Sequence, residues 1–123
     1  MAKNLLSATD VSMVFGGLKA VADFNMHIKY GELIGLIGPN GAGKTTAFNL
    51  LTGVYHPTTG EILFKDKSIV GLSPYQITAR GIARTFQNIR LFGELSVLDN
   101  VKIAYHCHMN YGLIEAVLRV GRY

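Results

Sequence analysis

The sequence predicts an α/β fold, and three features of its 123 residues support that prediction. A short apolar run at 33–37 leads directly into a glycine-rich loop at 38–45, and a helical pattern follows at 44–51. Two segments of β type precede the loop, and further strand and helix patterns follow it. A strand, a glycine-rich loop and a helix in this order are the context of a phosphate-binding P-loop. We therefore expect a P-loop domain preceded by an antiparallel β subdomain.

The first two elements are predicted to form an antiparallel hairpin. Segment 5–15 is rich in β-branched and apolar residues, and Gly16 and Gly17 interrupt it. Segment 18–30 alternates apolar and polar residues over 22–29, which is typical of a strand with one buried face. Two such strands joined by a Gly-Gly turn favour a hairpin.

The P-loop unit comes next. The nearly continuous apolar run 33–37 predicts a strand that is buried on both faces, as in a parallel sheet covered by helices. The helix over 44–51 is expected to end near Gly53. The later elements predicted are a turn at Thr58–Gly60, a strand at Glu61–Phe64, a turn at Asp66–Lys67, a helix at Pro74–Ala79, a strand at Ile82–Phe86, a helix at Ser96–His106 with Ser96 as its N-cap, and a helix in the tail Tyr111–Tyr123.

Composition is that of a globular protein. Hydrophobic residues make up 49% of the chain and charged residues 16%, which provides enough apolar material for a core. The net charge of +4 suits a polyanion such as a nucleotide phosphate, but the Lys and Arg residues are scattered, so no nucleic-acid partner is predicted. Cys107 is the only cysteine, which is typical of a reducing cytoplasm. The sequence has no signal peptide pattern and no apolar run of about 18 residues, so we expect a soluble, cytoplasmic chain.

The glycine-rich loop fits the P-loop pattern G-x-x-x-x-G-K-[ST] through Gly38, Gly43, Lys44 and Thr45. At average residue usage, a chance match in a chain of this length has a probability of about half a per cent. The competing interpretation is a glycine-rich turn whose lysine points to solvent, and the position between a strand and a helix favours the phosphate site. The predicted nucleotide contacts within the loop are Gly38, Pro39, Asn40, Gly41, Ala42, Gly43, Lys44, Thr45 and Thr46.

The residue types of this loop have separate physical roles. Gly41 and Gly43 allow the backbone to wrap closely, so that N–H groups face phosphate oxygens, and the helix adds the positive end of its dipole. Lys44 supplies positive charge to the β- and γ-phosphates, and the Thr45 hydroxyl is a magnesium ligand. Thr46 adds a donor near the α- or β-phosphate. The predicted cofactors are therefore ATP and Mg²⁺.

Three stretches carry a resemblance to a known family: residues 14–64, VFGGLKAVADFNMHIKYGELIGLIGPNGAGKTTAFNLLTGVYHPTTGEILF, residues 81–101, GIARTFQNIRLFGELSVLDNV, and the short tail. From about Leu5 to Tyr123, the chain resembles the N-terminal part of the ATP-binding subunit of ABC transporters, most closely of branched-chain amino acid importers. The resemblance implies that residues 1–123 are the N-terminal portion of an ABC-type P-loop NTPase domain, with the β subdomain and the P-loop core, and that this domain is incomplete.

The resemblance also implies roles outside the loop. Phe15 corresponds to an aromatic residue that stacks on adenine, although the pattern alone favours a core residue at a strand end. Gln87 falls in the glutamine loop, where its amide oxygen approaches the magnesium ion or the attacking water. The implied catalytic residues are thus Lys44 and Gln87, and the implied metal ligands are Thr45 and Gln87. The apolar residues Leu91, Phe92 and Leu95 are equally consistent with permease docking and with burial in this chain's own core.

Three motifs of this family are absent from the sequence: the LSGGQ signature, the strand that ends in Asp-Glu, and the switch histidine. His106 and His108 diverge on a helix, so they predict no metal site. Without the general base and the acidic magnesium partner, we expect nucleotide binding with poor turnover. The chain then resembles the N-terminal piece of a longer ATPase.

The leading hypothesis is the energising ATPase of an importer. The resemblance implies permease subunits and a second ATP-binding subunit as partners, at the inner face of the cell membrane. The alternative is a non-hydrolytic nucleotide-binding or assembly module. A P-loop kinase or GTPase is disfavoured, because the chain has the long hairpin before the loop and lacks the guanine-reading Asn-Lys-x-Asp.

Overall fold

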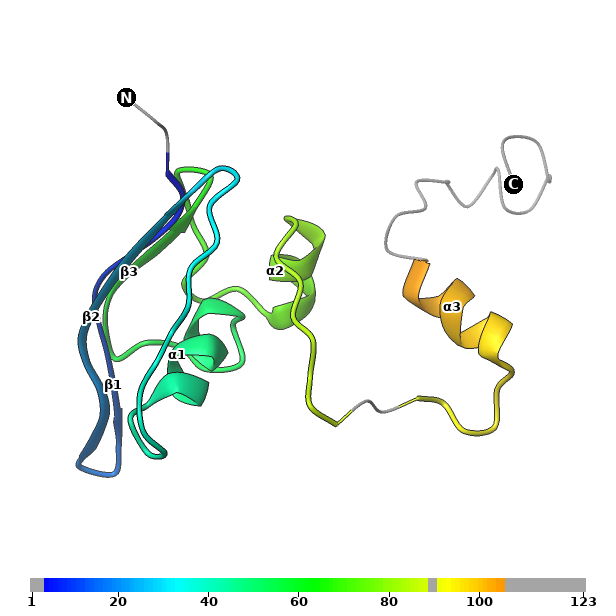
Figure 1. Ribbon diagram of the computed structural model, residues 1–123, viewed down its shortest axis with the longest axis horizontal. Helices are drawn as coiled ribbons and strands as arrows, with labels where there is room; N and C mark the ends of the chain where they lie inside the picture. The colour runs from blue at the N-terminus through cyan, green and yellow to red at the C-terminus, as the bar shows by residue number, and fades with distance from the viewer. Residues whose placement is uncertain (1–3, 89–90, 106–123) are drawn as a thin grey trace. The chain divides into compact units, whose positions relative to one another are not determined.

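The computed structural model describes residues 4–88 and 91–105. These residues form two compact units, of which the first ends at Arg84 and the second begins at Thr85. The elements of the first unit are β1 (Asn4–Phe15), β2 (Leu18–Lys29), α1 (Lys44–Leu51), β3 (Thr59–Phe64), β4 (Lys67–Ser68) and α2 (Pro74–Ala79), and the second unit holds α3 (Val97–Tyr105) (Figure 1).

The described strands form one antiparallel sheet in the order β2-β1-β3-β4. Phe15 at the end of β1 pairs with Leu18 at the start of β2, and both residues of the turn between them have positive φ, 49° at Gly16 and 94° at Gly17. Glycine adopts such angles without the steric cost of a side chain. The predicted hairpin is therefore confirmed, with ends within one residue of the expected ones.

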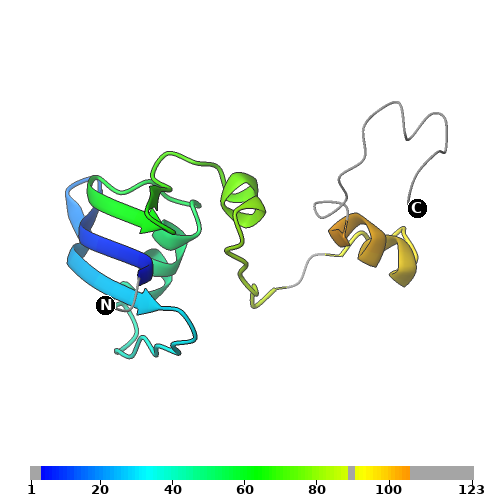
Figure 2. The ribbon, with the colours of Figure 1, turned by 90° about the horizontal axis from the view of Figure 1, so that it is seen from above.

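The core lies between one face of this sheet and α1, which runs along it in both ribbon views (Figures 1 and 2). Its buried residues come from the strands, from α1 and α2, and from the segments between them; they are Leu6, Ala8, Val11, Val21, Leu50, Ile62, Phe64, Ile69 and Ile77. The burial of Leu6 and Ala8 on β1 follows from the period-2 geometry of a strand, and the pattern shifts at Val11 and Ser12, where the pairing of β1 is irregular.

Both helices of the first unit have the predicted ends, 44–51 and 74–79. The second of them begins with a capping box, in which Gln76 Oε1 accepts from Ser73 N and from Ser73 Oγ, both at 2.9 Å. In the second unit, Asp99 N donates to Ser96 Oγ at 3.2 Å, which confirms Ser96 as the N-cap of α3. The predicted residue His106 and the tail helix 111–123 lie outside the described residues.

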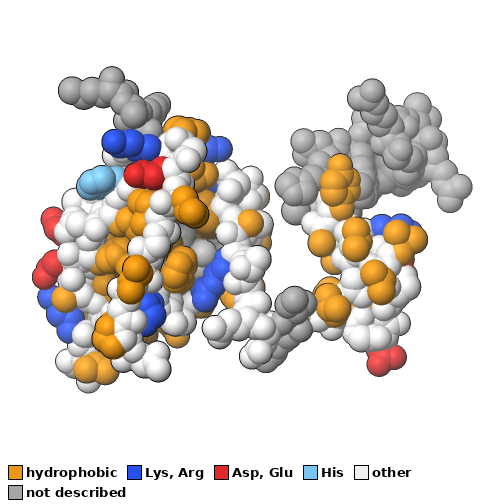
Figure 3. Space-filling view, viewed as in Figure 1, with side chains coloured by type: hydrophobic (Ala, Val, Ile, Leu, Met, Phe, Trp, Pro, Cys, Tyr) orange, Lys and Arg blue, Asp and Glu red, His pale blue; other side chains and the backbone are white. Residues whose placement is uncertain are grey.

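Two predicted strands are wrong. Residues 33–37 and 82–86 have no regular secondary structure, and Leu33 and Ile37 are 97% and 95% exposed. A strand is stabilised by ladder hydrogen bonds to a neighbour, and within residues 4–88 and 91–105 no strand lies beside either segment. The apolar run thus forms an exposed hydrophobic surface instead of a buried strand. Figure 3 shows hydrophobic side chains gathered on the visible face of the first unit.

Two turns are also shifted from their predicted positions. Thr59 and Gly60 belong to β3, and the turn after β3 consists of Lys65 and Asp66, with φ of 51° and 60°. Gly60 is required where it stands, because a Cβ there would lie 2.5 Å from Asp10 O. None of the helices between residues 4 and 88 or 91 and 105 is long and apolar enough to span a membrane.

Candidate nucleotide-binding site

The P-loop is a tight backbone turn that opens α1. Ala42 N donates to Pro39 O at 3.2 Å, and Gly41 and Gly43 have φ of 85° and 81°. Gly43 is the N-cap of α1, and its carbonyl accepts the first helical hydrogen bond, from Ala47 N, at 2.8 Å. The two glycines at left-handed angles therefore reverse the chain and aim it into the helix.

Gly43 also brings the loop against the hairpin. A Cβ at this position would lie 2.6 Å from Ala20 O and 3.3 Å from Val21 Cγ2, both on β2. A Cβ at Gly41 would meet no atom within 4 Å. Glycine is thus required at Gly43 for two reasons, backbone angle and close contact with β2, and at Gly41 for the backbone angle alone.

The loop offers a row of backbone donors. The N–H groups of Gly41, Gly43, Lys44, Thr45 and Thr46 have no hydrogen-bond acceptor among the described residues. Several of these belong to the first turn of α1, whose N–H groups have no partner within the helix, and the positive end of the helix dipole lies at the same place. An anion with several acceptor oxygens matches this arrangement.

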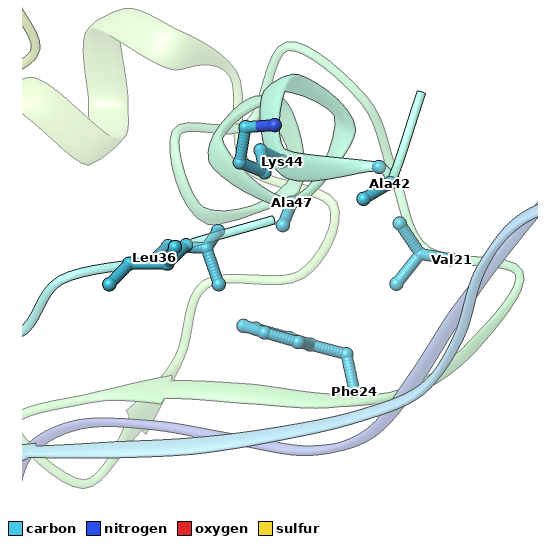
Figure 4. A pocket seen from close by; sticks show the side chains of 8 residues that line it. Val21, Phe24, Leu36, Ala42, Lys44 and Ala47 are labelled. Carbon is cyan, nitrogen blue, oxygen red and sulfur yellow. The ribbon is translucent and has the colours of Figure 1, made fainter. Parts of the chain in front are cut away.

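Lys44 adds a cation to these donors. Its Nζ donates to Gly38 O and to Pro39 O, both at 2.6 Å, so the side chain folds back along its own loop. Figure 4 shows the Lys44 amine on the side of the loop away from Phe24. The backbone donors, the Lys44 ammonium group and the hydroxyl of the exposed residue Thr45 together suit a nucleoside triphosphate with its magnesium ion.

A small pocket of about 70 Å³ lies on the other side of the loop, toward β2 (Figure 4). Apart from Lys44 and Gly43, its lining is apolar and consists of Val21, Phe24, Leu36, Ile37, Ala42 and Ala47. Phosphate oxygens require hydrogen-bond donors. Lys44 is the only lining side chain with a donor, and its Nζ donates to Gly38 O and Pro39 O. The pocket is therefore a space in the apolar layer, and its lining does not suit phosphate.

Phe15 lies at the end of β1 and is 40% exposed. Its ring contacts that of Tyr55 edge-on, with 5.2 Å between ring centroids and 74° between planes. A half-exposed ring held by a second aromatic residue suits base stacking better than the core position that the pattern alone favours. Adenine stacking by Phe15 stays a prediction.

Gln87 is exposed and belongs to the second unit, so its role toward magnesium and water stays a prediction as well.

Leu91, Phe92 and Leu95 are 71%, 59% and 42% exposed in the described chain, which argues against burial in a core of their own unit. Asn100 holds the turn before α3, since its side chain accepts from Phe92 N at 3.0 Å and donates to Phe92 O at 3.2 Å. No pattern in the sequence predicts this role of Asn100.

A hydrogen bond between α1 and Arg84 was also not predicted from the sequence. Arg84 Nη1 donates to Asn49 Oδ1 at 2.5 Å, in a partly buried position. The two residues are far apart in the sequence, and no local pattern indicates that they pair. Only the fold brings them together.

A G-x-x-x-x-G-K-[ST] loop at the N-terminus of a helix, with the lysine side chain folded across the loop, is characteristic of P-loop proteins. A family model described as ABC transporter matches residues 21–122. The chain belongs to the ABC transporter family, and the predicted resemblance is confirmed.

Individual relatives agree. The chain is 47% identical over 119 residues to the high-affinity branched-chain amino acid transport ATP-binding protein LivG of Escherichia coli K12, covering 97% of this chain and 47% of that protein. It is 41% identical to the protein BraF of Pseudomonas aeruginosa, which carries the same description, with the same coverage. The chain thus spans about half the length of the curated relatives it matches.

Solved structures show the same fold. An ATP-binding cassette of an ABC transporter in its ADP conformation matches with a TM-score of 0.76 and 29% identity, over 97% of this chain and 47% of that chain. A dimeric bacterial ABC transporter cassette matches with a TM-score of 0.74 and 25% identity, over 88% of this chain and 50% of that chain. The predicted fold class, an ABC-type P-loop fold with an N-terminal antiparallel β subdomain, is confirmed.

Proposed function

We propose that this chain binds ATP with Mg²⁺ as the N-terminal portion, residues 1–123, of the ATP-binding subunit of an importer for branched-chain amino acids. The observation that carries the proposal is the row of backbone donors at 41–46 without acceptors, beside the Lys44 ammonium at the N-terminus of α1. Donors that are already aligned need no reorganisation when the phosphates bind.

Each site residue has one role in this proposal. The N–H groups of the loop bind the phosphate oxygens, and Lys44 exchanges two carbonyl acceptors for the β- and γ-phosphates. Magnesium, when bound, neutralises charge on the phosphate oxygens. The Thr45 hydroxyl and the Gln87 amide oxygen are its proposed ligands from this chain, and Phe15 stacks on the adenine.

In the whole protein, ATP binding and hydrolysis drive amino-acid uptake through permease subunits, with a second ATP-binding subunit as dimer partner at the inner face of the membrane. The similarity to LivG and BraF, which are branched-chain amino acid transport ATP-binding proteins, supports the substrate class, and the similar dimeric cassette supports the dimer. The exposed apolar side chains Leu91, Phe92 and Leu95 support a contact of the second unit with the permease.

Titration of the 123-residue chain with a fluorescent ATP analogue, with and without Mg²⁺, tests the site. We expect binding that Mg²⁺ strengthens and that Lys44→Ala weakens at least about tenfold, because a hydrogen bond to a charged group contributes about 1.5–3 kcal/mol. Lys67→Ala is the matched control, since it removes the same charge from a site outside the loop. Equal affinity of the unmodified chain and Lys44→Ala contradicts the proposal, and a preference for GTP revives the kinase or GTPase interpretation.

A turnover assay tests the second part of the proposal. We expect negligible multi-turnover hydrolysis by the pure chain, since the acidic motifs are absent from its sequence. Hydrolysis that Lys44→Ala abolishes contradicts this. A reading frame that continues past Tyr123 into the LSGGQ and Asp-Glu motifs supports the importer ATPase, and a stop there supports the non-hydrolytic module.

A further inference from the structure

Asn49 connects three segments of the first unit. It lies on α1, the helix that follows the phosphate loop, and its side-chain oxygen accepts from Arg84 Nη1 at 2.5 Å. Its backbone carbonyl accepts from Val54 N at 2.9 Å and from Tyr55 N at 3.2 Å. Tyr55 contacts the ring of Phe15, the proposed adenine platform. A single residue of the phosphate helix thus contacts both the segment behind the adenine platform and the end of the first unit.

Arg84 stands at a boundary. It is the last residue of the first unit, and the second unit begins at Thr85. Gln87 follows three residues after Arg84, so covalent geometry alone keeps the two Cα atoms within roughly 11 Å of each other. The Asn49–Arg84 hydrogen bond therefore fixes, on the phosphate helix, the point from which the segment carrying Gln87 departs.

The Asn49–Arg84 hydrogen bond is suited to holding Arg84 on α1. It joins an amide oxygen to a guanidinium in a partly buried position, and hydrogen bonds that involve a charged group are the stronger ones. Asn49 is only five residues after Lys44 on the same helix. Because Asn49 belongs to the same short helix, phosphates that bind to the first turn of α1 also stabilise the part of the helix that holds Asn49.

We infer that Asn49 and Arg84 are positioning residues, whose hydrogen bond couples nucleotide binding at the P-loop to the segment that carries Gln87. Neither residue touches the nucleotide, and both act through the placement of Gln87. The inference rests on the proposed function, since it requires ATP at the P-loop. It adds two residues of the first unit that act through the chain segment leading to Gln87.

Hydrogen–deuterium exchange of the 123-residue chain, with and without saturating ATP and Mg²⁺, measures this coupling. In the unmodified chain, we expect the amides of 85–88 to exchange about tenfold more slowly with nucleotide. Asn49→Ala loses that protection, while the P-loop amides at 41–46 keep theirs. Asn49→Asp retains it, because a carboxylate also accepts from the guanidinium. Arg80→Ala is the matched control, since it removes an arginine bond to Ser68 O at 3.0 Å in the same stretch of chain and leaves protection intact.

The outcomes separate the inference from the proposed function. Undiminished protection of 85–88 in Asn49→Ala, or its loss in Asn49→Asp, overturns the inference and leaves the proposed function standing. Absence of ATP binding by the unmodified chain, or binding that Lys44→Ala does not weaken, overturns both. Should Asn49→Ala lack the native circular-dichroism spectrum, Arg84→Met takes its place, because methionine is unbranched and has no donor for Asn49 Oδ1, and protection that survives in that variant overturns the inference.

Discussion

Substitution of Gly43 by alanine measures how closely the phosphate loop is held against the hairpin. The residue has φ of 81°, and its Cβ would lie 2.6 Å from the carbonyl oxygen of Ala20. The left-handed angle costs an alanine about 1–2 kcal/mol, and the stiffer unfolded chain offsets about 0.4–1 kcal/mol of that cost. Contact with a backbone atom, which no side-chain rotation relieves, adds about 1–3 kcal/mol. We therefore expect Gly43→Ala to lower the free energy of unfolding by about 2–4 kcal/mol.

Gly41→Ala is the matched control. This glycine has φ of 85°, but a Cβ there would meet no atom within 4 Å, so only the backbone term remains, about 0.5–1 kcal/mol. Thermal unfolding followed by circular dichroism separates the two, because 1 kcal/mol shifts Tm by about 4–8 °C in a domain of this size. We expect a decrease of about 5 °C for Gly41→Ala and of at least about 10 °C for Gly43→Ala. Equal decreases for the two variants refute the contact between the loop and β2.

The remaining predictions concern the site and the sheet. Phe15→Ala is expected to weaken ATP binding by about fivefold or more, because stacking of an aromatic residue on a base contributes about 1–3 kcal/mol, whereas Phe15→Tyr keeps the affinity in the same titration. Thr45→Val is expected to abolish the strengthening of ATP binding by Mg²⁺ and to leave Mg²⁺-free binding unchanged. Thr78→Val is the control, since it makes the same substitution on α2, outside the loop, and a retained magnesium effect in Thr45→Val contradicts the ligand role. Gly60→Ala places a Cβ 2.5 Å from Val11 Cα as well as from Asp10 O, so we expect loss of the native circular-dichroism spectrum, and a stable variant refutes that packing.

Local patterns were sufficient for the hairpin and the helices. Alternation over 22–29, the Gly-Gly break and the proline at the start of 74–79 act over a few residues, so the sequence alone contains the information. The strand prediction at 33–37 failed because a parallel strand depends on neighbours that local sequence does not contain. The apolar pattern is typical of a buried segment, but Leu33 and Ile37 are exposed in the described chain.

The candidate site divides in the same way. The P-loop residues follow from a motif whose every position has a physical reason, and their predicted roles await the binding measurements. Phe15 and Gln87 could be singled out only through the family resemblance. The bond between Asn49 and Arg84 could not be predicted, because it joins two ordinary polar residues that only the completed fold brings together.

The hairpin sets the spacing between the two ends of the proposed nucleotide site. Gly43, at the phosphate end, is held against the carbonyl of Ala20 on β2. Phe15, at the adenine end, pairs with Leu18 of β2, and Leu18 precedes Ala20 by two residues on that strand. A strand rises about 3.3 Å per residue, so these two contact points on β2 are separated by about 7 Å along a rigid element. An insertion in the Gly16–Gly17 turn should therefore disturb adenine binding more than phosphate binding, because it displaces Phe15 relative to Leu18 and leaves the contact between Ala20 and Gly43 in place.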